Sequence, residues 1–159
     1  MLYAIKPVLM SIILIQSLLY NPAWKIYNNK TYKISFKYPA EWKPNPSYFN
    51  KYEGTNGFFQ ISASSGENLS IDDIVKFEIT HVSKPYGNNP TIKKLTIQRA
   101  EARLIIPSND QGAEMNNQAG LIVTYPKPIK INSTTYSYLI LWADKNHIEE
   151  ISNSIQFDY

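Results

Sequence analysis

The sequence predicts an α+β domain built on a largely antiparallel sheet with helices packed on it. Short stretches of alternating apolar and polar residues, which are typical of strands, fill most of the chain and are joined by short turns. Only two segments, residues 70–82 and 145–154, have apolar residues at helical spacing. Because short turns join antiparallel neighbours, the order of strands, helix, strands and helix indicates an antiparallel sheet covered by helices.

Two β-hairpins are predicted at the start of this domain. The first spans residues 24–38 and turns at Asn28-Asn29-Lys30, because asparagine tolerates the positive φ of a tight turn. The second pairs residues 47–53 with residues 57–63 around Gly54-Thr55-Asn56. In the first hairpin one face of the second strand is expected to be buried, and its members are Tyr32, Ile34, Phe36 and Tyr38.

Residues 70–82 form the stronger of the two predicted helices. Ser70 and Asp73 have the spacing of a capping box, and Asp72 adds a negative charge where the helix dipole favours it. The segment 84–87, with its proline and glycine, cannot continue the helix. At 100° per residue one apolar stripe is expected to face the sheet, formed by Ile71, Ile74, Val75, Ile79 and Val82.

Four more strands are predicted in the second half of the chain. Residues 91–97 and 101–106 form two of them, followed by a polar loop from Pro107 to Gln118. Residues 119–125 and 136–143 are apolar on both faces, as expected of central strands covered on both sides.

The end of the chain is expected to contain a break and a last helix. Pro126-Lys127-Pro128 is predicted to interrupt the chain between the two central strands. Asp144 is placed to cap the helix at 145–154. The apolar side of that helix consists of Ile148, Ile151 and Ile155.

Residues 1–23 differ from the rest and predict export. Lys6 and the free amine precede an uncharged apolar stretch, residues 8–20, which is typical of a signal peptide or an uncleaved signal anchor. The alternative is a buried N-terminal helix of a cytosolic protein, which the lack of a polar face disfavours. We therefore expect a secreted or membrane-anchored protein whose single domain, residues 24–159, lies outside the cytoplasm.

The composition excludes several classes of function. The chain of 159 residues has no cysteine, so disulfides, thiolate catalysis and cysteine-ligated metals are ruled out. The formal net charge is only +3 and Arg99 and Arg103 are the only arginines, which argues against a nucleic-acid partner. The H-E-x-x-H, G-x-S-x-G, phosphate-loop and dinucleotide motifs are absent. We expect no catalytic residue, no bound metal and no cofactor.

Glu78 is the first candidate site residue, because it falls inside the apolar stripe of the predicted helix. A carboxylate on a core face must be paired or must shift its pKa. His81 lies one turn further on, and Arg103 interrupts the apolar run 102–106, which makes it the natural partner of Glu78. Two interpretations stay open: a buried polar staple between helix and sheet, or a ligand-binding Glu78–His81–Arg103 cluster.

His147 and two polar loops are the other candidates. His147 follows Asp144 by three residues, so it is either a capping or surface histidine or a ligand-binding or pH-sensing group. The loops at 86–90 and 107–111 are rigid and polar, and the first carries an aromatic residue, which suits recognition. Their candidate contact residues are Tyr86, Asp110 and Gln111.

Several stretches resemble known domains. The segment YKISFKYPAEW, followed by a hairpin, a helix and a long antiparallel run, resembles the domain typified by the photosystem II extrinsic protein PsbP, which implies an α/β/α sandwich. The stretches EARLIIPSNDQ, AGLIVTYPKPI and YLILWADKNHIEEI resemble an uncharacterised extracytoplasmic domain of low-GC Gram-positive bacteria. In some chains that domain follows a membrane metallopeptidase of the β-lactam-sensor type. The resemblance covers residues 24–159, and no PsbP metal or photosystem-contact residue matches a position here.

These observations predict a non-enzymatic extracytoplasmic binding or accessory module. Its partner would be a protein or cell-envelope ligand, recognised by loops at one end of the sheet. One alternative is a sensor domain that works with an integral-membrane peptidase. Another is an enzyme of unrecognised type that uses Glu78, His81 and Arg103, which requires these three residues to line an open cleft.

Overall fold

The computed structural model describes residues 23–159. Apart from Ala23, the predicted signal peptide or anchor lies outside the described residues, and its export role stays a prediction. Within residues 23–159 no helix has the length and apolar character that crossing a membrane requires.

A seven-stranded sheet forms the centre of the domain. Every strand pairing within residues 23–159 is antiparallel, which confirms the predicted fold class. In spatial order the strands are β3 (Lys43–Pro44), β4 (Lys51–Gly54), β5 (Gly57–Ser64), β9 (Thr134–Asp144), β8 (Gln118–Ile131), β7 (Ala100–Ile106) and β6 (Thr91–Ile97).

The first predicted hairpin is confirmed, but it belongs to a second, smaller sheet. Strand β2 (Ile34–Pro39) pairs on one side with β1 (Trp24–Asn29) and on the other with the C-terminal β10 (Gln156–Phe157). The turn lies later than predicted, because Asn28 and Asn29 pair within the ladder. Lys33, with a φ of 53°, adopts the left-handed conformation at the end of this turn.

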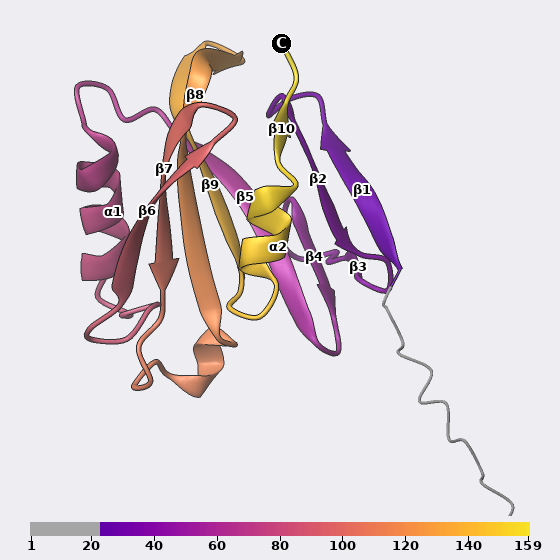
Figure 1. Ribbon diagram of the computed structural model, residues 1–159, viewed down its shortest axis with the longest axis vertical. Coiled ribbons are helices and arrows are strands. Elements are labelled where there is room, and N and C mark those ends of the chain that lie inside the picture. Colours follow the sequence, from indigo (N-terminus) through magenta and orange to yellow (C-terminus); the bar gives the residue numbers. More distant parts are fainter. Residues whose placement is uncertain (1–22) are drawn as a thin grey trace, which may run out of the picture.

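The layers of the domain bury both faces of the large sheet (Figure 1). Helix α1 (Ile71–Thr80) packs on one face, and helix α2 (Ile148–Asn153) and the small sheet lie on the other. Each face has its own hydrophobic cluster, so β8 and β9 are buried on both sides, as predicted for central strands. Members of the α1 cluster are Ile71, Ile74, Val75, Tyr86, Ile105, Ile122, Tyr138 and Ile140.

Strand β8 is longer than predicted. Pro126-Lys127-Pro128 does not interrupt it, since the pairing with β9 continues from Thr124 to Ile129 across a bulge or irregularity. A bulge tolerates proline, because the residues inside it donate no ladder hydrogen bonds.

Helix α1 begins as predicted and ends two residues early. Ser70 and Asp73 form the expected capping box. The chain becomes extended at His81, where ψ is 139°, and then turns before Pro85, a position at which a proline disfavours helical backbone. Val82 was predicted to belong to the buried stripe. Because the helix ends before it, Val82 is instead 91% exposed.

Helix α2 is shorter than the predicted 145–154. Its N-cap is His147 rather than Asp144, whose carboxylate accepts a hydrogen bond from the Asn146 amide in the preceding turn. The predicted apolar side is confirmed, because Ile148, Ile151 and Ile155 are all buried.

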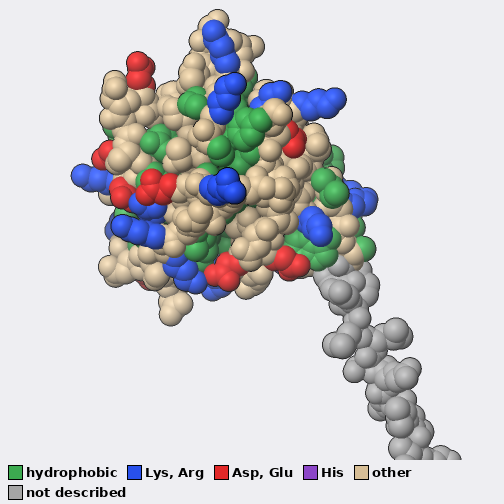
Figure 2. Space-filling model, turned by 45° about the horizontal axis from the view of Figure 1, so that its top comes forward, with side chains coloured by type: hydrophobic (Ala, Val, Ile, Leu, Met, Phe, Trp, Pro, Cys, Tyr) green, Lys and Arg blue, Asp and Glu red, His purple; other side chains and the backbone are tan. Residues whose placement is uncertain are grey.

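Charged side chains are mixed on the surface. On the face shown in Figure 2, Lys and Arg side chains alternate with Asp and Glu, and no broad area carries one sign. On the edge strand β6, Lys93 and Lys94 are exposed. Lysines on an edge strand disfavour pairing with a strand of another molecule.

Candidate ligand-binding groove

An open groove lies at the C-terminal end of α1, and we name it the Glu78 groove. Its volume is about 510 Å³. The end of α1, the turn that follows, the short 3-10 helix at Ala113–Met115, the start of β8 and the end of β9 form its walls. The lining residues are Phe77, Glu78, His81, Ser83, Pro85, Met115, Gln118 and Trp142.

Gly120 leaves room for the Tyr86 ring, which packs beneath the groove. It lies in β8 directly opposite Trp142 of β9. A Cβ atom on Gly120 would lie 2.5 Å from the hydroxyl oxygen of Tyr86, so only glycine leaves room for this ring. Tyr86 consequently lies fully buried against the sheet, beneath the groove. The prediction that Tyr86 is a surface contact residue is wrong, because its ring packs in the core, in the space that the missing side chain of Gly120 leaves free.

Two donors fix the carboxylate of Glu78 at the floor of the groove. The Tyr86 hydroxyl donates to Oε2 of Glu78 at 2.8 Å, and the indole Nε1–H of Trp142 donates to the same oxygen at 2.9 Å. Burial, followed by the negative charge of Glu78, raises the pKa of Tyr86 far above its ordinary value. The phenol therefore stays protonated and remains a donor at every working pH. Glu78 is held in one orientation, with its charge toward the groove.

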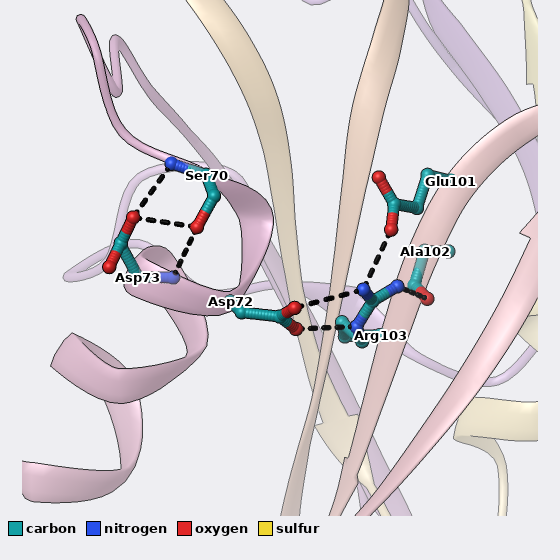
Figure 3. Close-up of polar contacts among 6 residues, drawn as sticks. All are labelled: Ser70, Asp72, Asp73, Glu101, Ala102 and Arg103. Carbon is teal, nitrogen blue, oxygen red and sulfur yellow. Dashed lines mark hydrogen bonds and ion pairs between the residues drawn. The ribbon is translucent and has the colours of Figure 1, made fainter.

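Arg103 does not pair with Glu78, which corrects the predicted staple. It bonds instead to Asp72 in the first turn of α1, with Nε–Oδ1 and Nη2–Oδ2 distances of 2.7 and 3.2 Å (Figure 3). Arg103 also donates to Glu101 at 2.7 Å and to the Ala102 carbonyl at 3.1 Å. A polar staple between helix and sheet does exist, but its acid is Asp72. The strand register determines this choice, because it places Arg103 at the opposite end of the helix from Glu78.

His81 lies exposed on the rim of the Glu78 groove. Its Nδ1 is 2.7 Å from the hydroxyl of Ser83, two residues away. Both hydrogen bonds of Glu78 come from Tyr86 and Trp142, so within the described part of the chain no bond links it to His81. The Glu78–His81–Arg103 cluster is therefore not assembled, and only Glu78 and His81 line the groove.

The two predicted loops pack against each other and support the groove. Gln111 donates from Nε2 to the Pro85 carbonyl at 2.5 Å and to the Gln118 carbonyl at 2.8 Å, and both acceptor residues line the groove. The exposed carboxylate of Asp110 accepts from the backbone and the side chain of Asn88. Gln111 thus positions one wall of the groove, Asp110 connects the two loops, and neither residue lines the groove.

The Asp110 contacts predict a local transition at low pH. Hydrogen bonds from Ser108 and then Asn88 lower the pKa of Asp110 from 3.8 to about 2. Because the folded pKa is the lower one, the carboxylate stabilises the loop pair above pH 4, and this stabilisation is lost as the pH falls toward 2. We expect the Asn88 amide resonance to titrate with a midpoint near pH 2, and Asp110→Asn to abolish this step. A midpoint near 3.8 would contradict the contacts.

His147 does not line the groove and packs on the face of the sheet that α2 covers. Its Nδ1 contacts both carboxylate oxygens of Asp144 at 2.8 and 2.9 Å. Its ring packs edge-on against Trp42, with ring centroids 5.0 Å apart. His147 is therefore half-buried beside a buried aspartate, and the structure does not bring it to the other candidate residues.

Sequence reasoning did not identify Trp142, Phe77 or Met115 as groove residues. Trp142 falls in a strand that is apolar on both faces, and nothing in that pattern distinguishes it from the core. A glycine inside a central strand does indicate the close approach of another group. Gly120 was therefore the signal in the sequence that could have located the site.

No family model matches the chain, and no curated protein sequence matches it. The fold is similar to the solution structure of cyanobacterial PsbP (CyanoP) from Synechocystis sp. PCC 6803, with a TM-score of 0.49 and 8% identity, over 86% of this chain and 93% of that one. This likeness concerns the course of the chain alone. The resemblance to a Gram-positive domain found with membrane metallopeptidases stays a prediction.

Proposed function

We propose that this protein is a non-enzymatic extracytoplasmic binding module that docks a protein ligand on the Glu78 groove. One observation carries the proposal: a carboxylate fixed by two buried or half-buried donors is surrounded by apolar side chains that face solvent. Phe77 is 64% exposed beside it. Exposed aromatic and methionine side chains around a fixed polar group are typical of protein interfaces.

The geometry favours binding over catalysis. Tyr86 and Trp142 both donate to the same oxygen of Glu78 and hold the carboxylate in one position, which suits recognition of a ligand group. The rival enzyme hypothesis requires Arg103 in the same cleft, and Arg103 bonds to Asp72 and Glu101 instead. An open groove with an exposed rim also suits a macromolecular surface better than an enclosed small molecule.

The location belongs to the proposal as well. The apolar stretch at residues 8–20 would export or tether the chain, so that the domain meets its ligand outside the cytoplasm. A tethered domain would act close to the membrane, where an integral-membrane protein is a suitable partner.

Site-directed photo-crosslinking in intact cells tests the proposal. A benzoyl-phenylalanine at position 77 replaces an aromatic residue on the groove rim. The same replacement at position 49 is the matched control, since Phe49 is 83% exposed and lines a different depression. We expect a discrete protein adduct from position 77 and none from position 49.

The other outcomes would contradict the proposal. Adducts of equal yield from both positions would indicate non-specific contact. An adduct from position 49 alone would place the binding surface on the other side of the domain. Adducts with glycan or lipid, without protein, would show that the ligand belongs to a different class.

A further inference from the structure

Within residues 23–159 only three acidic residues are withdrawn from solvent, namely Glu53, Glu78 and Asp144, and of these only Glu78 has no lysine, arginine or histidine within ion-pair distance. The ion pairs of this part of the chain join Asp72 and Glu101 to Arg103, Glu53 to Lys51 and Glu149 to Lys93, and the buried Asp144 contacts Nδ1 of His147. Glu78 is half-buried and takes part in none of them. A carboxylate that is partly withdrawn from water without a cation leaves a favourable position for one.

The lining of the groove strengthens this asymmetry. No lysine or arginine is among its described lining residues, and Phe77, Pro85, Met115 and Trp142 present apolar surface. Tyr86 and Trp142 both donate to Oε2, so within the described residues Oε1 accepts no hydrogen bond. The open oxygen therefore lies beside apolar walls, where water screens its charge less than on a free surface.

We propose that the groove takes a lysine or arginine side chain of the protein ligand, flanked by apolar residues. This inference rests on the function proposed above and names what the groove recognises. The ammonium or guanidinium group donates to Oε1 of Glu78, and the aliphatic stem of the side chain packs on Phe77 and Met115. Apolar neighbours in the ligand cover the rest of the rim.

Other ligand groups fit this site less well. A carboxylate or phosphate would meet the charge of Glu78 with no lysine or arginine among the described lining residues to balance it. A neutral amide can donate, but a hydrogen bond between two charged groups is shorter and about twice as strong. A bond of this kind corresponds to about 10-fold to 100-fold in affinity.

A peptide-display selection measures this preference directly. The full-length chain, immobilised in detergent solution, is exposed to a random dodecamer library, in parallel with Glu78→Gln and Glu149→Gln. The glutamine at 78 keeps an acceptor for Tyr86 and Trp142 and removes only the charge. Glu149 is an exposed acid that pairs with Lys93 outside the groove, so its variant controls for a general loss of negative charge.

We expect wild type and Glu149→Gln to enrich peptides with one lysine or arginine among apolar residues, and Glu78→Gln to lose this enrichment. A selected peptide should bind Glu78→Gln at least 10-fold more weakly than wild type. It should also shift the indole N–H resonance of Trp142, while the Trp42 indole, which is bonded to Asn56, stays in place. Acetylation of the peptide lysine should weaken binding to the same extent as Glu78→Gln.

Three results would overturn the inference: no enriched peptide, enrichment of peptides without basic residues, or unchanged enrichment in Glu78→Gln. Each result is distinct from a failure of the proposed function. If photo-crosslinking at position 77 still yields a protein adduct, the groove binds a protein through other contacts. If position 77 yields no adduct, the groove is not the binding surface in the cell, whatever the peptides show.

Discussion

Replacing Gly120 by alanine is expected to destabilise the domain by about 1–3 kcal/mol, the usual cost of forcing extra volume into a packed core. The new Cβ would lie 2.5 Å from the Tyr86 hydroxyl oxygen and 3.0 Å from Cζ of the same ring. Tyr86 is fully buried and cannot swing into solvent. The ring must therefore shift, and it would pull its hydrogen bond away from Glu78. Urea denaturation measures the loss in the free energy of unfolding.

Two further variants make this expectation specific. In Gly112→Ala the new Cβ meets only the flexible side chain of Glu114, which can move away, so the stability should change little. Adding Tyr86→Phe to Gly120→Ala removes the atom in closest contact. The penalty of the alanine should then be smaller than in the wild-type background, and this coupling appears as non-additivity. If the losses in unfolding free energy of the two single variants simply add up in the double variant, the Tyr86 hydroxyl does not pack against Gly120.

The second large effect is expected at Arg103, and it should depend on which partner is removed. The Arg103 side chain is 4% exposed, whereas those of Asp72 and Glu101 are 62% and 58% exposed. Neutralising both acids, as Asp72→Asn with Glu101→Gln, leaves a buried cation without a counter-charge and should cost about 3 kcal/mol. Arg103→Met removes the buried charge itself and should cost about 1 kcal/mol or less.

The pH dependence checks the same staple independently. The hydrogen bond from Arg103 lowers the pKa of Asp72 below its usual value. The pair therefore stabilises the domain above the unfolded pKa of about 4, and the contribution is lost as the pH falls through the lowered folded value. The melting temperature of wild type should fall more steeply below pH 4 than that of Arg103→Met. Parallel curves, or a larger cost for Arg103→Met than for the double acid variant, would contradict the staple.

Much of the fold was predictable, because local signals decided it. The alternation from Ile34 to Tyr38 and the capping box at Ser70 and Asp73 depend on neighbouring residues, and both predictions are confirmed. The separate small sheet was not predictable, since β2 pairs with β10 more than 100 residues away. Helix α1 ends at Thr80, earlier than the stop signal at 84–87 had predicted.

The site was predictable only in part. Glu78 was identified correctly as an acid out of place on an apolar stripe, but its partners come from the loop after the helix and from β9. Strand register decides that Arg103 faces Asp72 and that Trp142 stands opposite Gly120. Register arises from long-range packing, which hydrophobic periodicity alone does not determine. This is why the residue types were recognised and their pairing was wrong.

Solvent exchange of the indole protons tests directly whether the Glu78 carboxylate is fixed at the floor of the groove. The Nε1–H of Trp142 donates to Glu78, and that of Trp42 donates to Asn56, so one spectrum contains both the probe and its internal reference. In Glu78→Ala the Trp142 indole proton should exchange much faster than in wild type, while the Trp42 proton keeps its rate. Equal Trp142 rates in the two proteins would show that the indole does not hold Glu78, and the groove would lose the fixed charge on which recognition depends.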